Sequence, residues 1–321
     1  METLSLTVIE TRNAAPRVRD IRLARPDGGP LPSWQAGAHV KIRLPGGDTR
    51  SYSLVNATPE PAAATRPHHY RLGIRLEEAS TGGSAYMHGL VAGDAVTVEP
   101  PQNNFPLEPA EGPVTLVAGG IGVTPILAMA AELAAANHPF RFYYAGRSRA
   151  DFAFLDECRA VAGDRLTVHA DDEAGGFFDL RGVMAGLGAA GPLYLCGPLP
   201  MIEAARDQAK ALGWRDGRLH FEIFTAPTAA DGDQPFEVVL KSSGKSFVVP
   251  PGKTIVDVLV EAGEDPMFDC RRGDCGICQV GVVEGVPDHR DFILTESERA
   301  AGTLMQICIS RSKTPRLVID L

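Results

Sequence analysis

The nine residues CRRGDCGIC, 270–278, decide how the last part of this chain folds. They place Cys270, Cys275 and Cys278 at the spacing C-x₄-C-x₂-C, and Cys308 follows after residues 279–307. Structural zinc sites usually draw their ligands from two C-x₂-C pairs, whereas this spacing is that of plant-type 2Fe–2S ferredoxins. The segment therefore predicts a 2Fe–2S cluster held by these four cysteines. A structural zinc loop and unrelated reduced thiols are the alternatives.

The residues between the cysteines suit such a cluster. Gly273 and Gly276 allow a loop to turn tightly and to aim backbone N–H groups at the sulfurs. Arg271 and Arg272 can offset part of the negative charge of four thiolates. Cys158 lies apart from them in a helical pattern, so we expect it to be a buried structural cysteine.

The rest of the chain describes a soluble globular protein of several domains. It has 321 residues, 44% hydrophobic and 22% charged, which is too long for one ordinary core. A net charge of −9 argues against a nucleic-acid partner. No signal peptide and no run of ~20 apolar residues is found, so no membrane association is expected. The expected location is the cytoplasm, where clustered cysteines more often bind metal than form disulfides.

Two stretches rich in proline and small polar residues, 99–113 and 225–235, divide the chain. We therefore expect domains at 1–108 and 109–226, a linker at 227–235 and a last domain at 236–321. The first has short alternating segments between turns, which predicts an antiparallel barrel or sandwich. The second alternates five strands with four helices, which predicts an α/β parallel sheet. The third begins with a hairpin and an amphipathic helix before the cysteine loop.

A glycine turn joins the first strand of the middle domain to its first helix. In VAGGIGVTPI, 117–126, glycines such as Gly120 and Gly122 let the backbone approach a diphosphate at the helix N-terminus. Pro125 stands where a third glycine would complete the usual fingerprint, and such turns are also common in sheets without nucleotides. In LYLCGP, 193–198, the residues Cys196, Gly197 and Pro198 end a central strand, where open sheets bind ligands; a small core cysteine is the alternative.

The choice between NADH and NADPH rests on two conflicting signals. Asp171 and Asp172 end the third strand, where they would repel a 2′-phosphate, whereas Arg147 and Arg149 after the second strand could attract one. We lean to NADH, although the aspartates are equally consistent with a solvated loop.

The strand TRSYSLVN, 49–56, is the informative part of the first domain. Arg50 and Tyr52 fall on one face, offering a phosphate partner and a flat ring, and Ser53 falls on the other. The stretch TGGSAYMHG, 81–89, looks like a helix start, with Ser84 suited to a phosphate. A barrel strand with an exposed arginine and a packed tyrosine explains the same residues without a ligand.

Taken in order, RSYS, GGIGVTP, CGP and CRRGDCGIC resemble the phthalate dioxygenase reductase family, and the similarity covers essentially the whole chain. AGAHV, 36–40, and DHRDFIL, 288–294, agree with it. The resemblance implies an FMN-binding barrel, an NAD-binding sheet and a ferredoxin-like domain of the α+β (β-grasp) class. FAD in place of FMN is the nearest variant.

The resemblance also assigns roles to residues. It implies that FMN is held by Arg50 at its phosphate, by Tyr52 on its ring and by Gly83 and Ser84, with Ser53 near the hydride-accepting nitrogen. It implies that Gly120, Gly122, Thr124, Gly197 and Pro198 cradle NADH, that Asp171 favours it over NADPH, that Cys196 faces the nicotinamide, and that Glu222 and Phe224 border the flavin. The family often has an arginine before Gly-Gly-Ser, whereas Thr81 and Gly82 precede Gly83 and Ser84 here, so a cation is missing.

The implied activity is electron transfer from NADH through FMN and the 2Fe–2S cluster to a separate oxygenase. The sequence has no pattern of a Rieske centre, which needs two histidines and two cysteines, so the Rieske-type oxygenase is expected to be another protein. We expect a monomer. A redox- or NAD-responsive binding module with a structural metal site is the alternative function.

Overall fold

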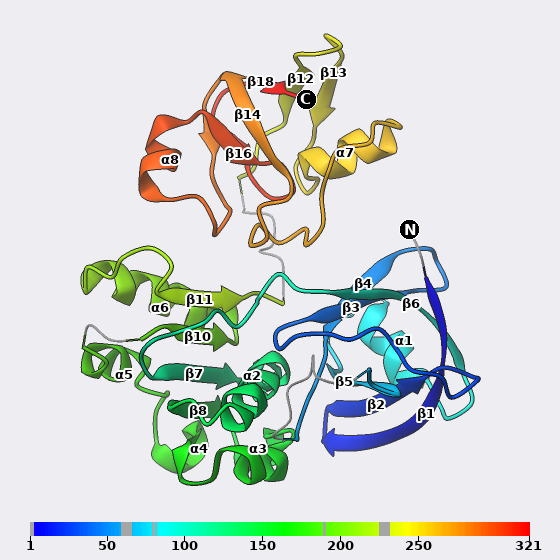
Figure 1. Ribbon diagram of the computed structural model, residues 1–321. Coiled ribbons are helices and arrows are strands. Elements are labelled where there is room, and N and C mark those ends of the chain that lie inside the picture. The colour runs from blue at the N-terminus through cyan, green and yellow to red at the C-terminus, as the bar shows by residue number, and fades with distance from the viewer. Residues whose placement is uncertain (1–2, 59–65, 79, 81, 189–190, 225–231) are drawn as a thin grey trace. The chain divides into compact units, whose positions relative to one another are not determined.

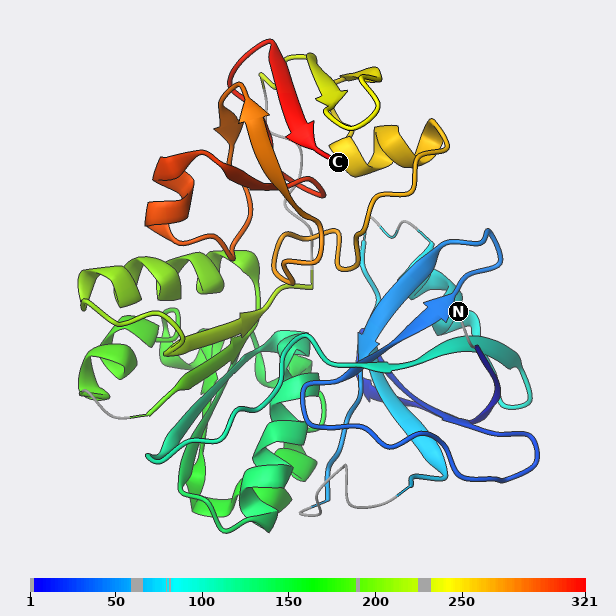
Figure 2. The same cartoon turned by 45° about the horizontal axis from the view of Figure 1, so that its top comes forward.

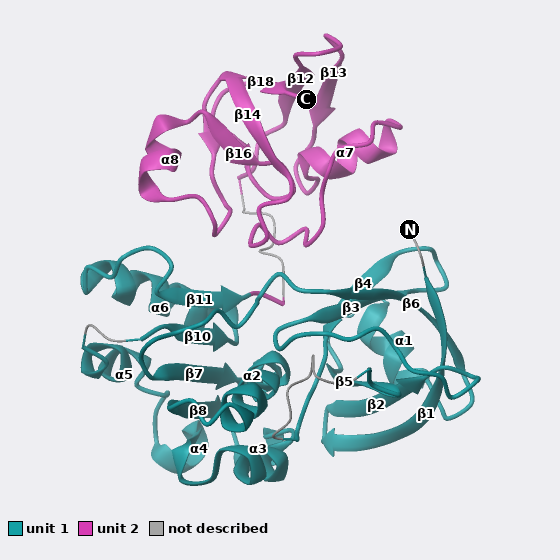
Figure 3. Ribbon diagram, viewed as in Figure 1, with its two compact units in different colours: residues 1–222 teal, residues 223–321 magenta. Residues whose placement is uncertain are grey.

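The computed structural model describes residues 3–58, 66–78, 80, 82–188, 191–224 and 232–321. Residues 1–222 form one compact unit and residues 223–321 a second (Figure 3). In the described ranges, no helix is long and apolar enough to cross a membrane. Thr81 and residues 227–231 of the predicted linker lie outside the described residues.

The first unit begins with an antiparallel sheet that closes on itself. Across the sheet the strands are β4 (Thr49–Ser53), β3 (His39–Arg43), β6 (Ala95–Gln102), β1 (Leu4–Ala15), β2 (Val18–Ala24) and β5 (His69–Arg75). A bridge between Leu54 and Leu72 joins the two edge strands. In β1, Leu4, Leu6 and Val8 are buried in alternation, as a half-buried strand requires. Figure 2 shows these blue-to-cyan strands curving round one interior.

The unit continues with a five-stranded sheet whose strands are all parallel. Its strands are β11 (Leu219–Glu222), β10 (Leu193–Cys196), β7 (Val114–Gly119), β8 (Phe140–Gly146) and β9 (Leu166–Ala170), in that order (Figure 1). Its helices are α2 (Val123–Ala135), α3 (Leu155–Ala162), α4 (Asp171–Ala174), α5 (Leu180–Gly186) and α6 (Leu199–Ala211). The chain moves outward from β7 through β8 to β9 and then returns to the other side of β7. The switch point therefore lies between β7 and β10, where open parallel sheets bind ligands.

Two local details differ from the expected helices of this sheet. The helical pattern from Asp151 becomes a regular α-helix only at Leu155, because Phe154 adopts a left-handed conformation with φ of 57°. Asp171 and Asp172 form the one-turn helix α4 instead of a strand end. Cys158 is fully buried in α3, as predicted.

The second unit is a mixed sheet with one helix packed on it. The strands run β13 (Ser246–Val249), β12 (Phe236–Leu240), β18 (Arg316–Asp320), β14 (Gln279–Glu284) and β16 (Leu304–Gln306), while β15 (Pro287–Asp288) pairs with β17 (Arg311–Ser312). The predicted hairpin is β12–β13, and the predicted amphipathic helix is α7 (Ile255–Glu261), capped by Thr254. A further helix, α8, spans Glu296–Ala301. The core includes Cys278 and Cys308.

The described end of the predicted linker is fixed to this second unit. The side chain of Asp233 is 5% exposed and pairs with Arg290 at 2.5 Å and with Arg311 at 3.4 Å. These ion pairs hold the chain to the second unit just before β12, the first strand of its sheet.

Candidate functional site

The glycine turn after β7 and the Cys-Gly-Pro turn after β10 meet at the switch point. A Cβ on Gly122 would lie 2.1 Å from the carbonyl oxygen of Cys196 and 2.9 Å from the nitrogen of Gly197. A Cβ on Gly119 would lie 2.7 Å from Cδ of Pro198. Because the opposing atoms at Gly122 are backbone, a larger residue would push the two turns apart. Two motifs 70 residues apart in sequence therefore form one edge of a site, which the sequence only suggested.

The start of α2 has the form of an anion site. Gly120 has φ of 54°, the left-handed conformation that glycine adopts freely. Thr124 is buried, and its hydroxyl donates to the carbonyl of Ile121 at 3.0 Å, which closes the first turn. Backbone N–H groups at a helix N-terminus attract phosphate, so this turn fits the diphosphate of a dinucleotide.

Two of the residues that were expected to choose between NADH and NADPH, Arg149 and Asp171, are each paired with a neighbouring side chain. Arg149 donates from Nε to Oε1 of Glu173 at 2.8 Å, and a second bond joins the same two side chains. The Nε2 of His169 lies 3.2 Å from Oδ1 of Asp171. Arg149 is thus already engaged by a carboxylate, which lowers its availability to a 2′-phosphate.

The predicted flavin residues of β4 lie against the start of α1 (Gly83–Gly89). A Cβ on Gly83 would lie 2.7 Å from Cγ of Arg50 and 3.2 Å from Oη of Tyr52, so the two side chains share one face as predicted. Burial raises the pKa of Tyr52 to about 12. The hydroxyl of Ser84 donates to Oγ of Ser80 at 3.0 Å and accepts from the backbone of the preceding loop.

Ser53, Cys196 and Glu222 come together where the barrel meets the parallel sheet. The Ser53 hydroxyl donates to Oε2 of Glu222 at 3.4 Å, and both residues are buried. Glu222 pairs directly with Cys196 in the register of β10 and β11. Three of the four residues predicted at the reacting centre are therefore neighbours. Phe224 is half-buried and belongs to the second unit, so the structure does not place it beside them.

The four predicted cysteine ligands gather in the second unit. Cys270 is within hydrogen-bonding reach of Cys275 and Cys308, which lower the pKa of its thiol. Cys278 is likewise in contact with Cys308. The loop between them turns through Gly273, where a Cβ would lie 2.7 Å from Cγ2 of Ile309. The sulfurs thus converge inside a loop with no room for larger residues.

This arrangement fits a 2Fe–2S cluster better than zinc. A structural zinc ion needs four ligands at one point, whereas each iron of a 2Fe–2S cluster takes two of the four cysteines. The contacts of Cys270 with Cys275 and of Cys278 with Cys308 are two pairs of this kind, and a contact between Cys270 and Cys308 joins them.

Three side chains around the cysteines were not anticipated in these roles. Arg271 pairs with Asp257 at 2.7 Å, so its charge is directed at that carboxylate rather than at the sulfurs. Asp274 accepts from the backbone N–H of Ile223 at 3.2 Å, and burial raises its pKa to about 6. Gln306 is fully buried, 3.4 Å from Sγ of Cys278. A buried amide beside a ligand sulfur can tune a cluster, but nothing in its sequence position marks it.

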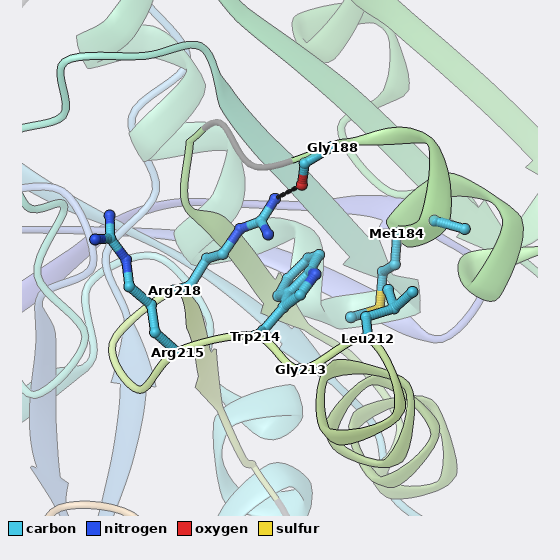
Figure 4. A pocket seen from close by; sticks show the side chains of 8 residues that line it. Met184, Gly188, Leu212, Gly213, Trp214, Arg215 and Arg218 are labelled. Carbon is cyan, nitrogen blue, oxygen red and sulfur yellow. Dashed lines mark hydrogen bonds between the residues drawn. The ribbon is translucent and has the colours of Figure 1, made fainter.

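A pocket of about 540 Å³ lies elsewhere in the first unit (Figure 4). Its lining includes Trp214 and Arg218, which precede β11. The pocket therefore lies at the amino ends of the strands, whereas the switch point lies at their carboxyl ends. Arg218 stacks on Trp214, 3.8 Å from the ring centroid, and donates to the carbonyl of Gly188 at 2.6 Å. These contacts give the arginine a structural role, so we do not assign the nucleotide to this pocket.

The site as a whole defines an oxidoreductase that joins an NAD-binding sheet to an iron–sulfur domain. Comparison with known families agrees, since residues 116–207 match the oxidoreductase NAD-binding domain and residues 238–313 match the 2Fe–2S iron–sulfur cluster binding domain.

Relatives of known name extend along the whole chain. The chain is 40% identical to phenoxybenzoate dioxygenase subunit beta of Ectopseudomonas oleovorans, over 94% of this chain and 92% of that one. It is 39% identical to vanillate O-demethylase oxidoreductase of Pseudomonas sp. (strain HR199 / DSM 7063), over 99% and 100%. It is 35% identical to phthalate dioxygenase reductase of Burkholderia cepacia, over 99% and 97%.

Solved structures agree. The structure of phthalate dioxygenase reductase, described as modular for electron transfer from pyridine nucleotides to [2Fe–2S], matches with a TM-score of 0.73 and 35% identity over 99% of this chain and 98% of that one. Full-length CYP116B46 from Tepidiphilus thermophilus matches with a TM-score of 0.78 and 35% identity; the match covers 99% of this chain but 42% of that longer one.

The chain belongs to the phthalate dioxygenase reductase family, the reductase components of oxygenase and demethylase systems, whose cofactors are FMN, NADH and a 2Fe–2S cluster.

Proposed function

We propose that this chain takes a hydride from NADH and passes the electrons singly to a separate Rieske-type oxygenase. The observation that carries the proposal is the meeting of Ser53 with Glu222 and Cys196, because it brings the barrel strand and the nucleotide switch point to one place. FMN, when bound there, would accept two electrons together and release them one at a time.

The residues that would hold the flavin come from β4 and α1. Arg50 would pair with the phosphate, Tyr52 would pack on the ring, and Gly83 would allow the phosphate close to the backbone. Ser84 would add to the phosphate site. Ser53 would lie at the reacting edge of the flavin, with Glu222 holding its hydroxyl.

The residues that would hold NADH flank the switch point. Gly120, Gly122 and Thr124 would cradle the diphosphate, while Gly197 and Pro198 would shape the opposite wall. Cys196 would face the nicotinamide. Two features favour NADH over NADPH. The carboxylate of Asp171 would repel a 2′-phosphate, and the guanidinium of Arg149 is already paired with Glu173.

We further propose a flavin domain at 1–108, a nucleotide domain at 109–226 and, after a linker at 227–235, a β-grasp domain at 236–321. In the last domain the cluster would be held by Cys270, Cys275, Cys278 and Cys308. Phe224 would border the flavin, and the protein would act as a cytoplasmic monomer. The relatives include a phthalate dioxygenase reductase, a reductase subunit of a toluene-4-sulfonate monooxygenase system and a vanillate O-demethylase oxidoreductase, which supports a separate oxygenase as the electron acceptor.

Reduction of cytochrome c by NADH tests this function against that of a binding module. A reductase should reduce cytochrome c catalytically, and a Cys278→Ala variant, which lacks a cluster ligand, should lose most of that rate. A protein that binds NADH but reduces no acceptor would instead be a sensor with a structural metal site.

A further inference from the structure

A cluster of charged side chains joins the barrel to the parallel sheet. Arg12 of β1, Asp20 of β2 and Arg71 of β5 come from the barrel, and Glu157 comes from α3. Arg71 donates to Asp20 at 2.8 Å and to Glu157 at 2.8 Å, and Arg12 donates to the same two carboxylates at 2.7 and 2.8 Å. Asp20 is 2% exposed and Arg71 9%. Both arginines therefore bridge a barrel carboxylate to Glu157.

A tight packing contact lies beside these charges. Gly73 of β5 has no room for a side chain, because a Cβ there would lie 2.6 Å from the ring of Phe154 and 2.7 Å from Cγ2 of Thr124. The Arg71 guanidinium lies 4.9 Å from the centroid of the Phe154 ring. Phe154 is buried in a left-handed conformation that bulky residues avoid. Such strain persists where the surroundings determine the conformation fully, and it concentrates at functional sites.

This arrangement, which we call the clasp (Arg12, Asp20, Arg71, Gly73, Phe154 and Glu157), adjoins the candidate site on both sides. On the barrel side, Leu72 bridges to Leu54, which directly follows Ser53. On the sheet side, Gly73 faces Thr124 in the first turn of α2. Arg71 and Gly73 of the clasp therefore flank Leu72, which pairs with the residue that follows Ser53. Gly73 also lies against Thr124, in the turn that would bind the dinucleotide.

Stability alone is a poor explanation for the clasp. Moving charged groups out of water costs solvation free energy, and the attraction between the charges offsets little more than this cost. Buried ion pairs therefore often add little net stability. What they do impose is one geometry, since Nε and Nη2 of both guanidinium groups donate to carboxylate oxygens of Asp20 and Glu157. An interface held this way resists sliding, which matters where two bound groups must react across it.

We propose that the clasp fixes the barrel against the parallel sheet so that flavin and nicotinamide are held at hydride-transfer distance, with Glu157 as the positioning residue on the sheet side. This rests on the proposed function. NADH and FMN, when bound, would supply the redox chemistry: a hydride would leave the nicotinamide carbon of NADH, giving NAD⁺, and would reduce the flavin at a ring nitrogen. The clasp residues do not touch either group.

Glu157→Gln tests this inference in the full-length holoprotein by anaerobic stopped-flow mixing with NADH. The amide keeps the size of the side chain but removes the charge that both arginines share. Flavin reduction at saturating NADH should slow by about threefold to tenfold, as small misplacements of reacting groups do. The dissociation constant of NADH and reduction of the cluster by dithionite should not change.

Asp156→Asn is the matched control, because Asp156 is the preceding residue of α3 and pairs with Arg159 at the surface. It should behave as the wild type. Gly73→Ala, which wedges the same interface from the barrel side, should slow flavin reduction at least as much as Glu157→Gln. If the Gly73→Ala variant does not fold, the rate of flavin reduction in the Glu157→Gln variant still decides whether the inference holds.

Wild-type rates in the Glu157→Gln variant would overturn the inference. So would weaker NADH binding at an unchanged limiting rate, since Glu157 would then serve binding rather than positioning. A wild-type protein whose flavin NADH does not reduce would reject the proposed function itself, and the inference with it.

Discussion

Arg50 lies against Gly83 at the candidate phosphate site. The family resemblance implies a second arginine shortly before this glycine, where this chain has Thr81. Phosphate affinity should therefore depend on Arg50 more heavily than in relatives that carry that arginine.

Replacing Arg50 with alanine should raise the dissociation constant of FMN about tenfold or more, because a charge-assisted hydrogen bond is lost. NADH binding should change little. Titration of the apoprotein with FMN, followed by fluorescence quenching, measures this. Arg43→Ala, on the neighbouring strand β3, is the control. An Arg50→Ala protein purified with a full complement of flavin would refute the role.

Replacing Glu173 with glutamine should make NADPH a better substrate. The change frees Arg149 from its carboxylate, and since exposed pairs are weak, we expect KM for NADPH to fall only about twofold to fivefold. Steady-state assays with both nucleotides give the ratio, with Asp164→Asn as an exposed control on the same domain. An unchanged ratio would mean that Arg149 does not reach the 2′-phosphate.

At the scale of elements, the strands of both first-unit sheets follow directly from alternation and apolar runs, and the four main helices follow from helical spacing. The start of α3 does not, because Phe154 is held in its left-handed conformation by the packing of Gly73 and Arg71. The clasp could not be predicted either. Arg12 and Glu157 are 145 residues apart, and each reads in sequence as an ordinary surface charge.

The clasp also predicts how the first unit responds to acid. Burial by itself would raise the pKa of Asp20, but the hydrogen bonds and charges of Arg71 and Arg12 outweigh it and bring that pKa below its ordinary value of 3.8. Likewise, Arg71 lowers the pKa of the half-buried Glu157 against the effect of burial. The stabilisation is therefore present above these ordinary values and is lost as the pH falls through the lower folded-state values.

Thermal unfolding between pH 6 and pH 3 should show this loss in the wild type below about pH 4. Asp20→Asn should be less stable at pH 6, by about 3 kcal/mol, because its arginines lose a buried partner. Its stability should then fall less steeply with acid. Parallel curves for the two proteins would exclude Asp20 as a source of the acid response.

At the scale of the whole molecule, the order of the parts was predictable because four motifs occur in the order of the electron path. The contacts between these motifs could not be predicted, because the contact of Gly122 with Cys196 and that of Ser53 with Glu222 depend on strand order and packing. The cysteine spacing was sufficient to predict the convergence of the four sulfurs, but not Gln306 beside them.

Cys275→Ala should separate the two halves of the path. The variant should lose its iron–sulfur absorbance and its transfer to one-electron acceptors, while NADH still reduces the flavin at a rate within about twofold of the wild type, because that step needs only the first unit. Visible spectra and stopped-flow traces give both quantities. Iron–sulfur bands that persist in the variant would overturn the ligand assignment.

The central claim is that one chain carries electrons from NADH through a flavin to a 2Fe–2S cluster. The most direct test is the ultraviolet–visible spectrum of the purified protein before and after anaerobic NADH. We expect overlapping flavin and iron–sulfur absorbance that bleaches when NADH is added. A colourless protein that contains zinc, or a coloured one that NADH leaves unchanged, would contradict the claim.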